Sequence, residues 1–164
     1  MTIEGSWSVH TVDGATVRLR SDRVRLMTVD VTAPVSGGEL DVSPDAVHLA
    51  LRLELDQLRT RNFLMQAAAR SLISRHDAGL LVYRGEGIPG ALPWPVRGRA
   101  RAGDVELELS LAVTPCGPVA DPMAEIELSG SANVGTVHLP LPGLGTVEDF
   151  SFDVDARLAM RPRH

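Results

Sequence analysis

The sequence predicts an all-β protein, an antiparallel β-barrel of about eight strands with one helix covering an end. Apolar and polar residues alternate through most of the chain, as in strands with one buried and one solvated face. Turn residues recur roughly every 8–15 positions. Only one stretch has the 3.6-residue spacing of a helix. A sheet with this many strands tends to close on itself, because open edges pair with other chains.

The composition indicates a single globular domain over residues 1–164. The net charge of −5 argues against a general binder of nucleic acids or anionic membranes. Aromatic residues make up only 4% of the chain, so a core must be built mainly from Val, Leu and Ala. All 16 basic residues are arginines, which is typical of GC-rich bacterial genomes. The absence of lysine excludes Schiff-base chemistry.

The N-terminal residues show neither the basic segment nor the apolar run of a secretion signal. No run approaches the ~20 apolar residues of a membrane span. The single cysteine, Cys116, cannot form an intramolecular disulfide, and its sequence neighbours include no cation that would activate the thiol. We therefore expect a soluble cytoplasmic protein.

The first part of the chain is expected to form short strands. Asp13 and Gly14 separate two alternating runs, and this pattern predicts a hairpin. A later run changes phase near Met27, which indicates a bulge or a break between strands. Gly37 opens another strand. The expected strands are residues 7–12, 16–20, 23–32 and 37–42.

The central segment, residues 46–74, is expected to form a strand followed by the helix. It opens as AVHLALRLEL, with an apolar residue, valine and then leucine, at every second position. The next apolar residues follow a helical period, and polar residues fill the opposite side. We expect this helix to cover an opening of the barrel. Its apolar residues are Met65, Ala68, Ala69, Leu72 and Ile73, and its polar residues are Arg59, Asn62, Gln66 and Arg70.

The second half of the chain returns to alternating strands. In one of them, arginines on one face oppose Gly98, Ala100 and Ala102. Small inward-facing residues indicate a tight bend or a ligand that approaches closely. Two proline- and glycine-rich loops and a frayed tail are also expected. The expected strands are residues 79–87, 96–102, 105–113, 124–134 and 150–160, the loops are residues 114–122 and 138–149, and the tail is residues 161–164.

No motif for catalysis or metal binding is present. No serine lies in a nucleophile-elbow context, and the paired glycines lack the strand–loop–helix context of a phosphate-binding loop. Carboxylates two residues apart on exposed faces are interpreted as solubilising charge. The histidines show no metal-ligand spacing. We therefore expect no catalytic residue, no metal, no cofactor and no enzymatic activity. The histidines are His10, His48, His76, His138 and His164.

The barrel interior remains as a candidate site. An eight-stranded barrel is either filled by its own side chains or holds one small ligand. The residues by themselves leave both alternatives open and favour the filled barrel.

The order of the elements resembles the YceI-like family of lipocalin-like barrels. SWSVHTVDGATVRLRSDRV is similar to the family's opening tryptophan and short hairpin, and GGELDVSPDAVHLALRLELDQL to its strand pair before the helix. AEIELSGSANVGTVHLP and DFSFDVDARLAM resemble its last strands. The chain departs from the family at residues 61–65, where the family's helical segment starts with an acidic motif, and so resembles a divergent member. The resemblance implies that the barrel binds an isoprenoid or another long apolar chain.

We therefore expect a non-enzymatic carrier that holds an isoprenoid or a fatty acyl chain inside its barrel. The alternative is a filled barrel that serves as a structural or protein-interaction module, with an outer arginine face that meets an acidic partner. The sequence leaves open whether the chain forms a homodimer. The expected ligand-binding residues are Leu51, Leu53, Phe63, Leu64, Met65, Leu72, Leu107, Leu109, Leu128, Phe150 and Phe152. The arginines of the alternative are Arg18, Arg20, Arg97, Arg99 and Arg101.

Overall fold

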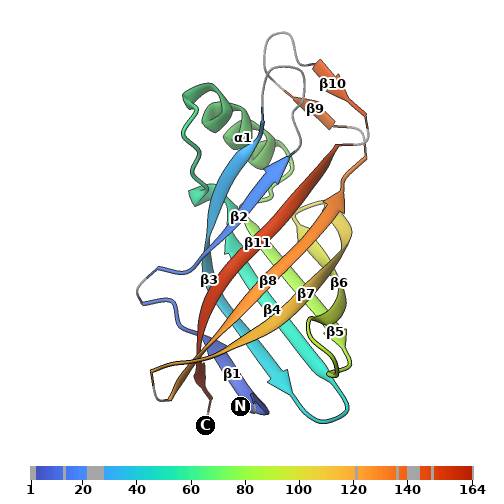
Figure 1. Ribbon diagram of the computed structural model, residues 1–164. Helices are drawn as coiled ribbons and strands as arrows, with labels where there is room; N and C mark the ends of the chain where they lie inside the picture. The colour runs from blue at the N-terminus through green and yellow to red at the C-terminus, as the bar shows by residue number, and fades with distance from the viewer. Residues whose placement is uncertain are drawn as a thin grey trace.

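A computed structural model shows an antiparallel β-barrel with one α-helix beside one end, within the described part of the chain (Figure 1). We call the end beside the helix the helix end and the opposite end the base. The described residues are 3–12, 14–21, 28–120, 122–135, 137–139, 145–148 and 150–163, excluding the side chains of 63–64, 118–120, 137–139 and 145–147.

Nine strands join in one sheet, and two short strands form a second sheet. The first strands are β1 (Gly5–Val9), β2 (Thr16–Ser21), β3 (Asp30–Val42), β4 (Val47–Glu54) and β5 (Leu80–Gly87). The later strands of the large sheet are β6 (Trp94–Ala102), β7 (Val105–Ala120), β8 (Met123–Asn133) and β11 (Ser151–Pro162). The small sheet pairs β9 (Val137–Leu139) with β10 (Gly145–Val147). A 3₁₀ turn, η1 (Leu55–Gln57), and the helix α1 (Phe63–Arg75) connect β4 to β5.

The large sheet closes because β11 pairs with β8 on one side and with β2 on the other. Every pairing between neighbouring strands is antiparallel. Strand β1 shares the position of β2 between β3 and β11, closer to the base. The described strands therefore form a closed barrel with eight strand positions. The predicted all-β antiparallel barrel with a single helix is confirmed.

The hairpin predicted around Asp13 and Gly14 is wrong. Strands β1 and β2 do not pair with each other, and both pair antiparallel with β3 and β11. They therefore run in the same direction, one after the other. The chain turns between them, where the Gly14 amide donates to the Thr11 carbonyl and Gly14 has a φ of +83°. Asp13 itself lies outside the described residues. Pairing with two long strands outweighs the local preference for a hairpin.

The two strands predicted at residues 23–32 and 37–42 are not separated where the sequence suggested. Strand β3 continues from Asp30 through Pro34 to Val42, where two separate strands were expected, and residues 22–27 lie outside the described residues. Pro34 is tolerated because β4 pairs with β3 only from Val35 onward. A bulge follows between Val35 and Gly37.

The two predicted loops of the second half also contain strand. Strand β7 runs to Ala120, and the region beyond Val113 pairs with β8 alone, with bulges beside Pro115 and Pro118. Proline is compatible with strand at such edges and bulges. The second loop contains the β9–β10 pair. The tail is not frayed at Arg163, whose amide donates to the Ser6 carbonyl at 2.8 Å.

The helix follows the predicted pattern and starts at Phe63, after a polar cap. The Asn62 Oδ1 atom accepts a hydrogen bond from the Met65 amide at 3.2 Å, which satisfies a free donor of the first turn. The Gln66 side chain donates to the Leu58 carbonyl at 2.7 Å and accepts from the Thr60 amide at 3.0 Å. These bonds tie α1 to the segment that leaves the barrel after η1. Met65 is buried, as its helical spacing predicts.

Candidate ligand-binding interior

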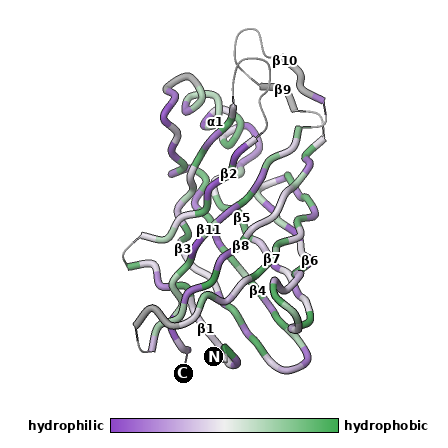
Figure 2. Tube along the Cα trace, in the orientation of Figure 1, coloured by the Kyte–Doolittle hydropathy of each residue, from purple (hydrophilic) through white to green (hydrophobic). Residues whose placement is uncertain are grey.

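The inner face of the barrel is formed by every second residue of its strands. Burial alternates along β3, β4, β6 and β8, and Figure 2 shows hydrophobic and hydrophilic residues alternating along the strands. Apart from Tyr83 and the two tryptophans, the one buried side chain with a polar group among the described residues is Ser21, whose Oγ accepts a hydrogen bond from the Val29 amide at 2.9 Å. The interior is therefore an apolar environment.

The base half of the barrel is closed by its own side chains. Trp7 and Trp94 lie at this end, and each indole N–H donates to a backbone carbonyl, that of Ile3 at 2.9 Å and that of Gly90 at 3.1 Å. The large side chains above them have at most 1% of their surface exposed, as in a close-packed core. These are Leu40, Val47, Leu49, Val96, Val113, Ile126, Leu158 and Met160.

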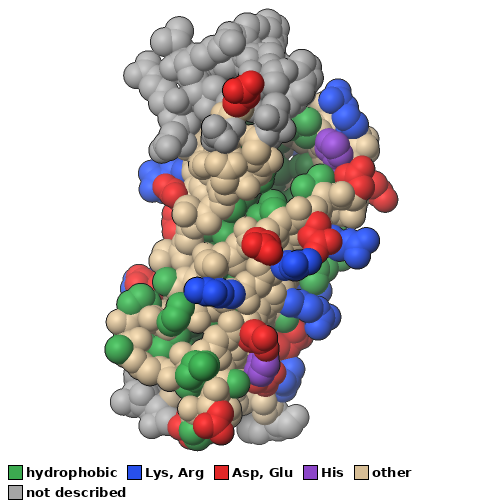
Figure 3. Space-filling view, turned by 90° about the vertical axis from the view of Figure 1, so that its right-hand side faces the viewer, with side chains coloured by type: hydrophobic (Ala, Val, Ile, Leu, Met, Phe, Trp, Pro, Cys, Tyr) green, Lys and Arg blue, Asp and Glu red, His purple; other side chains and the backbone are tan. Residues whose placement is uncertain are grey.

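The helix-end half is less completely covered. Several apolar residues pack against the core but remain partly exposed. Among the described residues, each member of this set that is larger than alanine lies in the helix-end half, on β2, β5, β7, β11 or the segments beside them. Figure 3 shows hydrophobic side chains recessed in a hollow toward this end of one face. The set comprises Leu19, Val29, Leu55, Ile73, Leu81, Leu107 and Phe152.

The small inward residues do not leave an empty space in the middle of the barrel. Gly85 and Gly98 pair in register on β5 and β6. The phenol of Tyr83 lies over them, since a Cβ atom on Gly85 would stand 2.5 Å from the Tyr83 Oη atom. That hydroxyl donates to the Leu109 carbonyl at 3.0 Å. The close approach that the glycines indicate is therefore made by the protein itself. Burial raises the pKa of Tyr83 to about 12.

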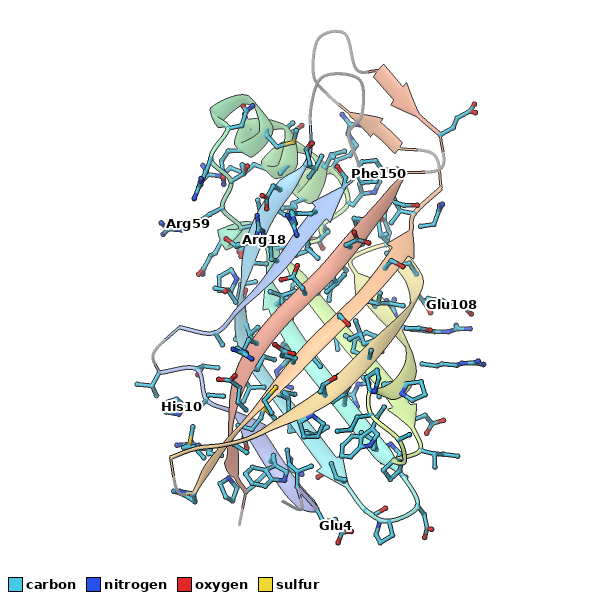
Figure 4. All side chains as sticks on the ribbon, viewed as in Figure 1. Glu4, His10, Arg18, Arg59, Glu108 and Phe150 are labelled. Atoms are coloured by element: carbon cyan, nitrogen blue, oxygen red, sulfur yellow. The ribbon has the colours of Figure 1, made fainter. Side chains whose placement is uncertain are left out.

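The predicted ligand-binding residues fall into two groups. Leu51, Leu53, Leu109 and Leu128 are buried in one core cluster, and Leu107 and Phe152 are partly buried against it. Met65 is buried on the helix, and Leu72 on the same helix is half-buried. Phe150 is half-buried at the helix end (Figure 4). None of these three residues belongs to the core cluster. The side chains of Phe63 and Leu64 lie outside the described residues.

The sequence prediction missed several residues of this region. Leu19 and Leu81 lie in the helix-end half and were not predicted as binding residues. Leu128, which was predicted as one, lies instead deep in the closed part of the barrel. Tyr83 was missed although it alternates in phase with Leu81 along β5, a signal that the sequence does contain. From the helix, Ala69 and Ile73 pack against the core cluster. Their predicted position on the apolar face of the helix could have suggested this role.

The arginines proposed as one outer face do not form a single patch. Strands β2 and β6 are separated in the sheet by β3, β4 and β5. On β2, Arg18 binds Asp30 through two hydrogen bonds of 3.0 and 2.7 Å. Hydrogen bonding from Arg18 is the main reason that the pKa of Asp30 is lowered. On β6, Arg99 pairs with Glu106 at 3.1 Å.

The described residues contain no group of His, Cys, Asp or Glu side chains arranged to hold a metal ion. The exposed Cys116 does have a cation near it, because the fold brings Arg157 of β11 close, while the thiol itself donates to the Thr114 carbonyl at 3.4 Å. The nearby Glu125 carboxylate is the main reason that the pKa of Arg157 is raised. The described helices include none long and apolar enough to cross a membrane.

No protein-family model and no curated protein matches this chain. Among solved structures, its fold is similar to that of BcnA from Burkholderia cenocepacia, with a TM-score of 0.62. The two share 8% sequence identity, and the superposition covers 92% of this chain and 98% of BcnA. At this identity the likeness shows the fold alone. The chain thus has a lipocalin-like β-barrel fold.

Proposed function

We propose that this protein is a non-enzymatic carrier that holds an apolar ligand in the helix-end half of its barrel. The observation that carries the proposal is the contrast between the two halves. The large apolar side chains of the base are almost fully buried, whereas those of the helix end are left partly exposed. A ligand that covered them would remove apolar surface from water, which stabilises a complex by roughly 25 cal/mol per Å².

A long chain fits this arrangement better than a compact polar molecule. The described interior offers little hydrogen-bonding capacity, since the Tyr83 hydroxyl is already bonded to the Leu109 carbonyl. The partly exposed apolar side chains extend from Leu107 and Phe152 to Ile73 on the helix. Together with the resemblance to YceI-like proteins, this supports an isoprenoid or a fatty acyl chain as the ligand class. Leu53 and Met65 would line its path.

The first test is native mass spectrometry of the purified protein, followed by organic extraction of any bound molecule. The second is titration with a fluorescent long-chain fatty acid. Replacing Leu107 by Gln should weaken probe binding about tenfold or more, because a buried leucine is worth roughly 1.5–3 kcal/mol. Leu92→Gln is the matched control, since Leu92 lies near the base and is 57% exposed.

Thermal unfolding of both variants shows whether they remain folded. Equal effects of Leu107→Gln and Leu92→Gln on probe binding would contradict the proposed site. A protein that neither copurifies with an apolar molecule nor binds the probe would contradict the carrier function.

A further inference from the structure

A groove of about 870 Å³ crosses the outer face of strands β3 to β7, on the opposite side of the sheet from the apolar interior. Its floor includes Ala50 and the backbone of Gly85 and Gly98. Gly98 must be glycine, since a Cβ atom there would clash with the Arg84 carbonyl and lie 2.6 Å from the Gly85 Cα atom. The volume is within the range of small-molecule sites, about 300–1,000 Å³.

The carboxylates that line this groove are already paired. Glu39 contacts Arg52 at 3.1 Å, and Asp41 contacts Arg163 at 2.8 Å. Glu108, which projects outward from β7 (Figure 4), lies 3.6 Å from Arg99.

The remaining carboxylate of the groove, Glu86, lies 3.9 Å from the His48 ring, an ion pair when His48 is protonated. None of these four carboxylates forms an ion pair with Arg84 or Arg97, the two other arginines of the groove, although Glu86 opposes Arg97 directly across the β5–β6 ladder.

Arg84 and Arg97 form no hydrogen bond or ion pair with any side chain in the described ranges. Arg84 also faces Arg99 directly across the β5–β6 ladder. Like charges in directly opposed positions destabilise a sheet. Arg84 and Arg97 thus lie on neighbouring strands without an ion pair among the described residues, and the charge opposite Arg84, Arg99, is paired with Glu106 and Glu108.

We propose that this groove binds the phosphate or carboxylate group of a small molecule between Arg84 and Arg97. Arg97 is the diagonal neighbour of Arg84, because Arg84 opposes Arg99 and Arg97 precedes Arg99 by two residues. Diagonal neighbours lie about 7–8 Å apart, so both long side chains reach one anion. A guanidinium binds either anion through two parallel N–H···O bonds.

The test uses the whole protein with inorganic phosphate and with succinate, each compared with sodium chloride at equal ionic strength. Calorimetric titration and thermal unfolding are followed for the wild type and for Arg84→Gln, Arg97→Gln and Arg101→Gln. Arg101 is the matched control, because it is an exposed arginine of β6 outside the groove and forms no ion pair with the described residues. All three variants lose the same charge.

We expect saturable binding of phosphate, succinate or both by the wild type, and the preferred anion identifies the ligand chemistry. Arg84→Gln and Arg97→Gln should each weaken it about tenfold or more, because each removes a charge-assisted contact, and Arg101→Gln should leave it unchanged. Absence of saturable binding, or an equal loss in Arg101→Gln, would overturn the proposal. Binding of the fatty-acid probe should be unaffected by all three variants, so this result is separable from that of the carrier function.

Discussion

Replacing Tyr83 by Phe measures how much one hydrogen bond inside the barrel contributes to the stability of the fold. Tyr83 is 2% exposed, and its ring fills the space over the paired glycines of β5 and β6. Its hydroxyl donates to the Leu109 carbonyl at 3.0 Å, so one side chain bridges from β5 across β6 to β7. Phe keeps the ring and removes only this hydrogen bond.

The expected cost of Tyr83→Phe is about 1 kcal/mol, rising toward ~3 kcal/mol if the Leu109 carbonyl stays unsatisfied. In a protein of this size, a loss of 1 kcal/mol lowers the melting temperature by roughly 2–4 °C. Tyr83→Ala removes the ring as well and leaves a cavity beside the glycines. It should cost about 3–5 kcal/mol, as other losses of buried aromatic rings do.

The composition of the chain allows the titration of Tyr83 to be measured with little interference from other groups. The chain has a single tyrosine and no lysine, so few other groups titrate in the alkaline range. Burial raises the pKa of Tyr83 from 10.0 to about 12, which means that the folded state favours the neutral phenol. Its stabilising effect is therefore fully present below pH 10 and is lost as the pH rises toward 12, because the unfolded chain releases this proton first.

Two measurements check this reasoning. Phenolate absorbance of the folded protein, followed against pH, reports the pKa of Tyr83 directly. Chemical unfolding at several alkaline pH values should show the stability of the wild type falling more steeply than that of Tyr83→Phe. A tyrosine that titrates near 10.0 in the folded protein, or a Tyr83→Phe variant with an unchanged melting temperature, would refute the assignment.

Two further substitutions test the barrel wall. Gly98→Ala should be strongly destabilising in thermal unfolding, because its Cβ atom would meet the Arg84 carbonyl, whereas Gly90→Ala should be nearly neutral because nothing lies within 4 Å; similar melting temperatures for both would contradict the packing described. Arg18 lowers the pKa of Asp30, so this pair stabilises the fold at neutral pH and stops doing so as the pH falls through the lowered value. Asp30→Asn should therefore reduce the loss of stability on acidification, measured by unfolding midpoints; an acid dependence identical to the wild type would count against the pair.

The strand content of the chain was predictable because alternation is a local property. A pleated backbone points successive side chains to opposite faces, so the period of two in residues 46–54 and 105–113 is visible without any knowledge of their partners. The helix was predictable for the same reason, since Met65 and Ala68 follow its period. These patterns also identified which residues face inward, including Leu51, Leu53 and Leu109, which are buried.

Strand partners were not predictable in this way. Asp13 and Gly14 have the local preference for a hairpin, yet β1 and β2 pair with β3 and β11, which are far away in the sequence. The same long-range pairing carries β7 through Pro115. Partner choice is decided by closing the whole barrel, a sum over many distant hydrogen bonds and packed side chains.

By itself, the sequence determined an apolar, alternating barrel with one helix, because these features depend only on residue order. The tertiary structure alone decided how the interior is occupied. It places Tyr83 over the glycines, fills the base with Trp7 and Trp94, and leaves Leu107 and Phe152 partly exposed. It also separates the arginines of β2 from those of β6. Each of these depends on which side chains from distant strands meet in space, and the local period of a strand carries no information about that.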